Sequence, residues 1–142
     1  MPHADAVGRE SPHAGFSTSR PWLPLSPNAV VENVGQQRRD AHSIYHLYRK
    51  LIAVRKSQPA LQLGSYRSLT AAGDVLLYAR ELAGSSIFVA LNLGAEPTVV
   101  SFPRDAVSGT LLLSTYCDRE HEPVSGDLAL RAHEGAILKL SS

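Results

Sequence analysis

Apolar residues follow two different periods along this chain, a helical period in the middle and a two-residue period after it. Between residues 40 and 61 they recur at the i, i+3, i+4, i+7 and i+8 spacing of one helix face, which predicts an amphipathic α-helix. The stripe consists of Ile44, Leu47, Tyr48, Leu51 and Ile52. Asp40 is the expected N-cap. Pro59 is expected to end the helix, because the residue before a proline is disfavoured in the α region.

Residues 62–142 alternate between apolar and polar positions in short runs that turn residues separate. The alternation is typical of strands with one buried face. Seven strands are expected, at 65–70, 75–82, 86–92, 98–102, 110–115, 127–132 and 136–140. Their spacing of about ten residues, without helical patterns between them, predicts a mainly β fold, a small antiparallel β-sandwich.

Residues 1–39 contain so many prolines and glycines that no helix or strand of useful length is expected there. This irregular Pro-rich segment nevertheless carries apolar side chains, which predicts that it packs against other structure. They are Phe16, Trp22, Leu23, Leu25, Val30 and Val31. A loop near forty residues long is uncommon inside a compact domain, so we interpret the chain as part of a larger protein.

Composition narrows the function classes. The chain has 142 residues, 44% of them hydrophobic, and 14 basic residues against 13 acidic ones give a net charge of +1. No nucleic-acid or membrane partner is expected from this balance, and the basic residues of the helix are interpreted as its solvated face. The single cysteine, Cys117, excludes an internal disulfide and favours the cytoplasm, and no targeting segment or membrane span is recognisable.

Several histidines and one cysteine are candidates for a chemical role. His42 and His46 have the i, i+4 spacing that could share a metal, but no HExxH glutamate accompanies them, so exposed histidines are the preferred interpretation. Asp118 and Glu120 flank Cys117 and are expected to raise its pKa, which disfavours a nucleophile. His121 and His133 lack a recognisable serine partner.

The remaining motifs offer no site either. The glycines form neither GxGxxG nor GxxxxGK, so no cofactor is expected. The thirteen acidic residues are scattered, and nothing marks two of them as a facing pair of the kind that glycosidases use. From the residues alone, no catalytic, cofactor-binding or metal-binding position is predicted.

Three segments resemble the C-terminal end of α-glucosidases and oligo-1,6-glucosidases of the α-amylase superfamily (glycoside hydrolase family 13). They are AGFSTSRPWLPL at 14–25, QQRRDAHSIYHLYRKLIAVRKSQPAL at 36–61 and LALRAHEGAILKL at 128–140. The resemblance implies that 1–39 is the loop after the last barrel strand, 40–61 the last barrel helix and 62–142 the β-sandwich called domain C. The sequence departs from the family's pattern at residues 8–14, where the chain passes almost directly from Gly8 and Arg9 to Ala14.

The resemblance also implies that the family's catalytic carboxylates, which act by double displacement on malto- or isomalto-oligosaccharides, lie on barrel strands that would precede Met1. We therefore expect a non-catalytic C-terminal fragment or domain with a structural role. Its expected partners are the catalytic barrel of a parent glucosidase, or a second copy in a homodimer through the helix. The alternative is a freestanding carbohydrate-binding or protein-interaction module that stacks sugars on Trp22 and the tyrosines.

Overall fold

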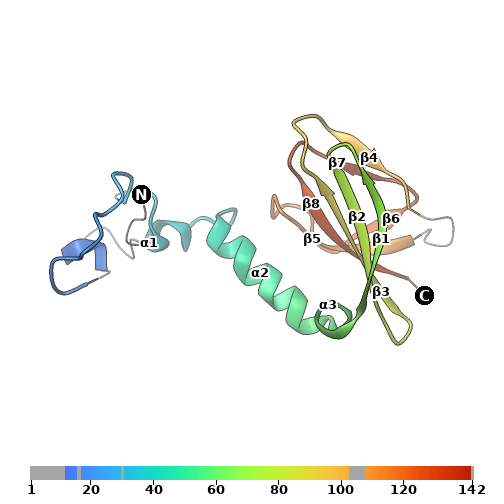
Figure 1. Cartoon of the computed structure of the whole chain (residues 1–142), viewed down its shortest axis with the longest axis horizontal. Coiled ribbons are helices and arrows are strands. Elements are labelled where there is room, and N and C mark those ends of the chain that lie inside the picture. The colour runs from blue at the N-terminus through green and yellow to red at the C-terminus, as the bar shows by residue number, and fades with distance from the viewer. Residues whose placement is uncertain (1–11, 16, 30, 103–107, 142) are drawn as a thin grey trace. The chain divides into compact units, whose positions relative to one another are not determined.

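The computed structural model describes residues 12–15, 17–29, 31–102 and 108–141 (Figure 1). The chain divides into two compact units, Met1–Tyr48 and Arg49–Ser142. Gly8, Arg9, Phe16 and Val30, which the sequence analysis used, lie outside the described residues. None of the described helices is long and apolar enough to cross a membrane.

In the described part of the first unit, the helices before Ser43 are single turns, the 3-10 turn η1 (Pro12–Gly15) and α1 (Val34–Gln37). Asn33 caps α1, because its Oδ1 accepts the Gln36 amide at 3.0 Å and its Nδ2 donates to the Ala29 carbonyl at 3.0 Å. Trp22 is 87% exposed and Val31 68% exposed within this chain, so the packing of these two side chains against other structure stays a prediction.

The long helix α2 (Ile44–Ser57) begins later than predicted. Ser43 occupies the position before its first residue, and its Oγ accepts the His46 amide at 3.5 Å. Asp40 instead accepts the His42 amide at 2.9 Å within the preceding turn. Asp40 as the N-cap is therefore wrong, because its side chain closes a local turn and lies four residues before Ile44, the first residue of the helix.

Pro59 ends α2, as predicted, but it also begins a second helix, α3 (Pro59–Leu63). Gln58 between them has extended backbone angles, with φ −118° and ψ 97°, as expected before a proline. Proline is well tolerated at the first position of a helix, where its missing N–H would have no intrahelical partner. The predicted helix of 40–61 is thus two helices joined at one extended residue.

The apolar stripe of α2 is largely in contact with solvent. No residue of this helix is buried, and Ile44, Tyr48 and Ile52 are 58%, 61% and 51% exposed. Leu47 and Leu51 are half-buried. Because Ile44, Tyr48 and Ile52 are four residues apart, they form one line along the helix, here called the exposed apolar line.

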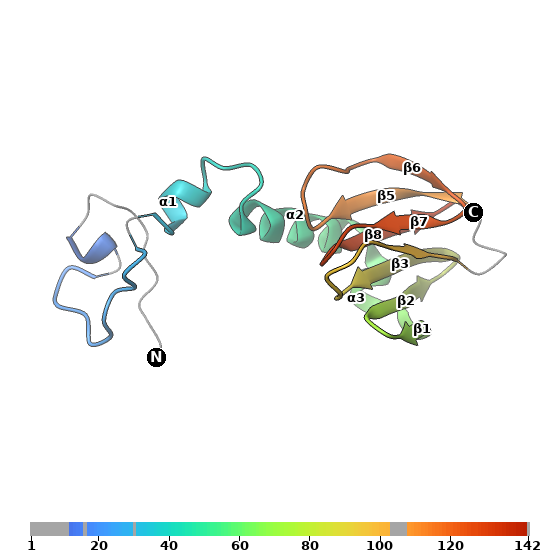
Figure 2. The same cartoon turned by 90° about the horizontal axis from the view of Figure 1, so that it is seen from above.

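After residues 49–57 of α2 and the helix α3, the second unit forms an antiparallel β domain with two sheets (Figures 1 and 2). The larger sheet has the order β1-β2-β3-β8-β5-β6, and the smaller one pairs β4 with β7. The strands are β1 (Ser65–Ala72), β2 (Val75–Leu82), β3 (Ser85–Asn92), β4 (Thr98–Val100), β5 (Ser108–Ser114), β6 (Glu122–Ser125), β7 (Leu128–Leu130) and β8 (Gly135–Leu140). The prediction of a mainly β, antiparallel sandwich after a helix is confirmed.

Strand β6 is the strand that the sequence analysis does not predict, because Pro123 and Gly126 are residues typical of turns. In the structure Pro123 pairs with Thr110 on β5, and β6 forms one edge of the larger sheet. Proline is compatible with an edge strand, where one donor can be lost. The strand β1 forms the other edge, and its pairing with β2 shifts register between Ser68 and Thr70, which is a β-bulge.

The core lies between the two sheets. It combines alternate residues of the larger sheet with apolar residues of the smaller one, among them Leu77, Ala79, Phe88, Ala90, Leu111, Val100, Leu128, Leu130 and Leu138. The central strand β3 departs from the predicted alternation, because Ile87, Phe88, Val89 and Ala90 are all buried.

Helix α3 explains part of this burial on the second face of β3. It packs against β2 and β3, and its Ala60 is only 1% exposed. Arg80, which pairs with Ile87 and so shares the face opposite the core, donates from Nη2 to the Gly64 carbonyl at the end of α3 at 2.7 Å. Both views place α3 beside the end of the larger sheet where β1 begins and β2 ends (Figures 1 and 2).

Candidate functional site

A buried carboxylate is the most unusual polar group of the β domain. Glu134, in the turn before β8, has a side chain that is 0% exposed. Its Oε1 accepts from the Ser114 hydroxyl at 2.5 Å, and its Oε2 accepts the Arg131 amide at 2.8 Å. Burial by itself raises the pKa of this carboxyl. The hydrogen bonds from Arg131, from Ser114 and from the Arg131 backbone together outweigh burial and lower its pKa to about 2.

Arg131 joins Glu134 to the surface. Its guanidinium donates to Glu134 at 2.8 and 3.0 Å and also to both carboxylate oxygens of Asp118, at 2.6 and 2.8 Å. The guanidinium carbon lies 4.0 Å from the centroid of the Tyr116 ring, a cation–π contact. The hydrogen bond from Arg131 is the main cause that lowers the pKa of Asp118.

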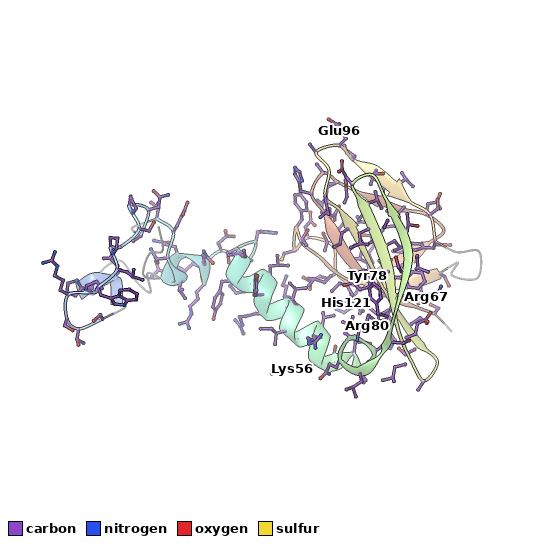
Figure 3. The ribbon with its side chains drawn as sticks, viewed as in Figure 1. Lys56, Arg67, Tyr78, Arg80, Glu96 and His121 are labelled. Atoms are coloured by element: carbon purple, nitrogen blue, oxygen red, sulfur yellow. The ribbon has the colours of Figure 1, made fainter. Side chains whose placement is uncertain are left out.

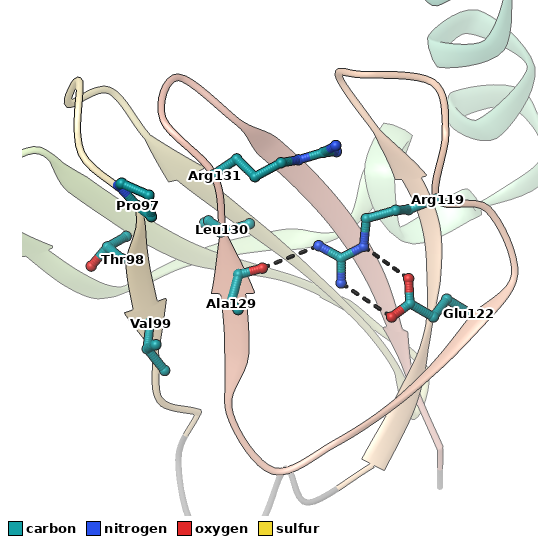
Figure 4. Close-up of a pocket in the computed structure, with 8 residues that line it drawn as sticks. All are labelled: Pro97, Thr98, Val99, Arg119, Glu122, Ala129, Leu130 and Arg131. Carbon is teal, nitrogen blue, oxygen red and sulfur yellow. Dashed lines mark hydrogen bonds and ion pairs between the residues drawn. The ribbon is translucent and has the colours of Figure 1, made fainter.

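A second arginine completes the cluster. Arg119 donates to both carboxylate oxygens of Glu122 at 2.8 and 3.2 Å and to the Ala129 carbonyl at 3.1 Å, and its Nη1 lies 3.7 Å from Glu134 Oε1. Figure 4 shows this side chain reaching from the β5–β6 connection to β7 and β6. It borders an open depression of about 720 Å³, lined by Pro97, Thr98, Val99, Arg119, Glu122, Ala129, Leu130 and Arg131.

The chemistry of this cluster is that of a structural network. Asp118, Glu122 and Glu134 each accept hydrogen bonds from an arginine, and the pKa of each carboxyl is lowered. A carboxyl that stays ionised at neutral pH cannot act as a general acid. Bidentate arginine–carboxylate pairs, by contrast, fix the relative positions of the segments that carry them.

The histidine pair of the sequence analysis does not share a helix face. His42 lies in the turn before α2, whereas His46 lies within the helix. A ring nitrogen of His46 is 3.0 Å from the Arg38 carbonyl, and its ring contacts Tyr45 edge-on at 5.3 Å. Within the described residues, no group of three histidine, cysteine or acidic side chains could hold a metal ion.

The other candidates lie in turns of the β domain. Cys117 is 8% exposed, and burial, with smaller contributions from Glu120 and Asp118, raises the pKa of its thiol. The expected direction is confirmed, although burial is the larger cause. His121 donates its amide to Leu111, and His133 donates its amide to Gly94. Both histidines therefore lie in turns that their backbone amides help to close.

Sequence reasoning missed the convergence of carboxylates on two arginines. Asp118, Glu122 and Glu134 belong to the scattered acidic residues of the sequence, but strand pairing brings β5, β6 and β8 together and places these three carboxylates near one another. The available signal was Arg131 three residues before Glu134, followed at once by the apolar strand of 136–140. That spacing allows both the side-chain pair and the hydrogen bond from the Arg131 amide within one turn.

A separate aromatic pair lies on the face of the larger sheet away from the core. The rings of Tyr66 and Tyr78 have centroids 5.2 Å apart, and Tyr66 is 58% exposed. Figure 3 shows Tyr78 close to Arg80, whose Nε is the one buried side-chain nitrogen or oxygen without a hydrogen-bond partner in the described part of the chain. Most buried polar side-chain atoms have a hydrogen-bond partner, so Arg80 Nε is an exception.

The comparisons with known proteins agree with this division of the chain. Residues 6–64 match the family model described as "Alpha amylase, catalytic domain", and residues 64–137 match the one described as "Domain of unknown function (DUF3459)". The chain belongs to the α-amylase family of glycoside hydrolases, family 13, and corresponds to the end of the catalytic domain plus the C-terminal domain.

Individual relatives are similar to this chain over most of its length. An oligo-1,6-glucosidase of Bacillus cereus is 32% identical over 90% of this chain, and another of Halalkalibacterium halodurans is 34% identical over 90%. The trehalulose synthase of Pseudomonas mesoacidophila MX-45 gives a TM-score of 0.80 at 31% identity over 93% of this chain. The chain spans only 23% of the two glucosidases and 24% of the synthase.

Proposed function

We propose that this chain is the non-catalytic C-terminal part of a glycoside hydrolase that acts on α-glucosides, and that its role is structural. The relatives named oligo-1,6-glucosidases make a 1,6-linked α-glucoside the favoured substrate class for the parent protein. In this proposal the β domain covers and stiffens the barrel. A cytoplasmic location, which the sequence favours, belongs to the same proposal.

The exposed apolar line of α2 is the observation that carries this proposal. Ile44, Tyr48 and Ile52 are more than half exposed on a helix that the catalytic-domain model includes. Each large apolar side chain gains about 1.5–3 kcal/mol when it is fully buried, so the line represents several kcal/mol that packing on a barrel would recover. A free-standing domain would have little reason to carry it.

A chimaera tests the structural role. The Bacillus cereus oligo-1,6-glucosidase would be cut before the region that matches this chain and joined to this chain, with the truncated enzyme as reference. We expect the chimaera to hydrolyse isomaltose and the truncated enzyme to be inactive. A chimaera that folds no better and is no more active than the truncated enzyme would overturn the proposal.

A matched pair of variants shows whether the apolar line is responsible. In the chimaera, Tyr48→Asp with Ile52→Asp is expected to lower the thermal midpoint and the yield of active enzyme. Val99→Asp changes a side chain of similar exposure, 62%, on the smaller sheet and should change neither quantity.

The chain alone should not hydrolyse glucosides, since the resemblance puts the family's catalytic carboxylates outside it. Incubation of the purified chain with p-nitrophenyl α-glucoside and maltose is the measurement. Turnover that co-purifies with the chain and disappears when one of its own carboxylates is replaced would contradict this expectation.

The exposed aromatic side chains support a second candidate, a carbohydrate-binding module. Trp22 is 87% exposed, and the Tyr66–Tyr78 pair offers an aromatic surface of the kind on which sugars stack.

Titration with maltose, isomaltose and soluble starch distinguishes the two functions. A thermal midpoint that rises with ligand concentration would favour the module, and a constant midpoint with unchanged Trp22 fluorescence favours the structural role.

A further inference from the structure

Three successive charged residues between β5 and β6 reach different elements of the second unit. Asp118 binds Arg131 in the turn before β8, and Arg119 binds Glu122 on β6 and the Ala129 carbonyl on β7. Glu120 accepts a hydrogen bond from Lys50 Nζ on α2. We propose that residues 118–120 form a clamp that fixes the direction of residues 49–57, the part of α2 within the second unit, relative to the β domain.

The backbone holds this clamp at both ends. Cys117 and His121 flank it with positive φ values of 57° and 59°, which are uncommon for residues other than glycine. The Cys117 amide donates to the Ser114 carbonyl at 2.9 Å, and the His121 amide donates to the Leu111 carbonyl at 2.7 Å. Both acceptors belong to β5, so the clamp is anchored to a strand of the larger sheet.

Ion pairs within the β domain hold residues 118 and 119 of the clamp in place. Arg131 binds Asp118 and the buried Glu134 together, and Glu134 also accepts from Ser114 on β5. Glu120 therefore follows two residues that arginine–carboxylate pairs hold in place, Asp118 by Arg131 and Arg119 by Glu122. A single exposed ion pair contributes little on its own, but one that ends on a preorganised segment loses less side-chain entropy when it forms.

At its C-terminal end, α2 is joined to α3 through a bend. Gln58 is the one extended residue between α2 and α3, and two hydrogen bonds, from Arg55 to the Leu61 carbonyl and from Gln62 to the Lys56 carbonyl, hold the bend. Lys50 lies eight residues before Gln58, about 12 Å along a helix. The helix is thus attached to the β domain at two points, the bend and Lys50. Two points of attachment define the direction of the helix, whereas one point would let it rotate.

Charge reversal tests the clamp in the full chain. Lys50→Glu and Glu120→Lys each bring like charges together, and the double variant restores an ion pair of opposite sense. We expect amide hydrogen exchange of residues 49–57 to be about two- to fivefold faster in each single variant and to return towards the original rate in the double variant. The exchange of β2 and β3 should not change.

Arg67→Glu is the matched control. It breaks an exposed ion pair with Glu81 that joins β1 to β2, so it should leave the exchange of α2 unaltered. Lys50→Met, which removes the pair without adding repulsion, should accelerate exchange in the same direction but less. Unchanged exchange of residues 49–57 in both single reversals, or acceleration that the double variant does not reverse, would overturn the proposal.

Discussion

At the scale of single residues, Glu134 shows how a buried charge is kept. Removing an ionised carboxylate from water is costly unless hydrogen bonds and a cation replace the lost solvation. Here Ser114, the Arg131 amide and the Arg131 guanidinium all donate to it. The residue pattern alone could not reveal this, because the partners come from β5 and from the turn before β8, which are adjacent only after the sheet has formed.

The first prediction concerns the pH dependence of stability. The pKa of Glu134 in the folded chain is about 2, against an ordinary value of 4.5. The carboxyl therefore contributes stability above pH 4.5, and this contribution is lost as the pH falls towards 2. The lost contribution corresponds to about 3 kcal/mol of unfolding free energy.

Urea unfolding at several pH values measures this effect. Glu134→Gln should be less stable at neutral pH and should lose less stability on acidification than the original chain. Glu96→Gln, at an exposed loop position, is the control and should follow the original profile. Parallel pH profiles for the original chain and Glu134→Gln would show that the assignment is wrong.

At the scale of elements, caps and turns decided where the prediction succeeded. The periodicity of 44–52 correctly predicted α2, and alternation predicted most strands. The error at Asp40 arose because two cap-forming residues precede the helix, and Ser43 is the one immediately before the first apolar position. The pattern does not predict α3, because a proline that ends one helix can also begin the next, and Pro59 does both.

The second prediction is that Ser43→Ala destabilises α2. Without the hydroxyl, the His46 amide loses the acceptor that it has at 3.5 Å, and such caps contribute about 1 kcal/mol. Asp40→Ala removes a side chain that accepts only in the preceding turn and should cost less. Amide exchange at the first turn of α2 measures both variants, and a larger effect for Asp40→Ala would restore Asp40 as the cap.

The third prediction concerns the junction of α3 and β1. A Cβ atom at Gly64 would collide with the Ala60 carbonyl oxygen and lie 2.9 Å from that of Glu81. Both obstacles are backbone, so the junction would have to move. Gly64→Ala should lower the unfolding free energy by about 3 kcal/mol.

Gly73→Ala separates this steric effect from backbone conformation. Gly73 has φ +57° and nothing within 4 Å of the added atom, so only the cost of a left-handed alanine applies, about 1 kcal/mol. Equal losses in urea unfolding for the two variants would show that the predicted collision is relieved.

At the scale of the whole molecule, the exposed apolar line of α2 is a surface that we expect another structure to cover. Ile44, Tyr48 and Ile52 are the large apolar side chains at one face of a helix whose residues are nowhere buried. The sequence predicted the stripe correctly but could not predict its exposure, because burial depends on which other structure is present. The family resemblance, and not the periodicity, is what suggests a barrel as that structure.

The fourth prediction is that the isolated chain associates through this line at high concentration, most simply as a two-fold dimer. Light scattering should show a mass that rises with concentration. Tyr48→Asp with Ile52→Asp should keep the chain monomeric while the β signal in circular dichroism is retained, and Val99→Asp should leave association intact. A monomeric original chain at the highest attainable concentration would contradict the prediction.

The two edges of the larger sheet have a consequence for how such a chain can fail. Open edges can recruit strands from other molecules and nucleate fibrils. Here one edge strand, β6, contains Pro123, which has no N–H to donate, and the other, β1, is interrupted by the bulge between Ser68 and Thr70. Each edge therefore presents an incomplete template for strand addition. We expect this chain to form assemblies that remain soluble and reversible, even while α2 lacks its partner.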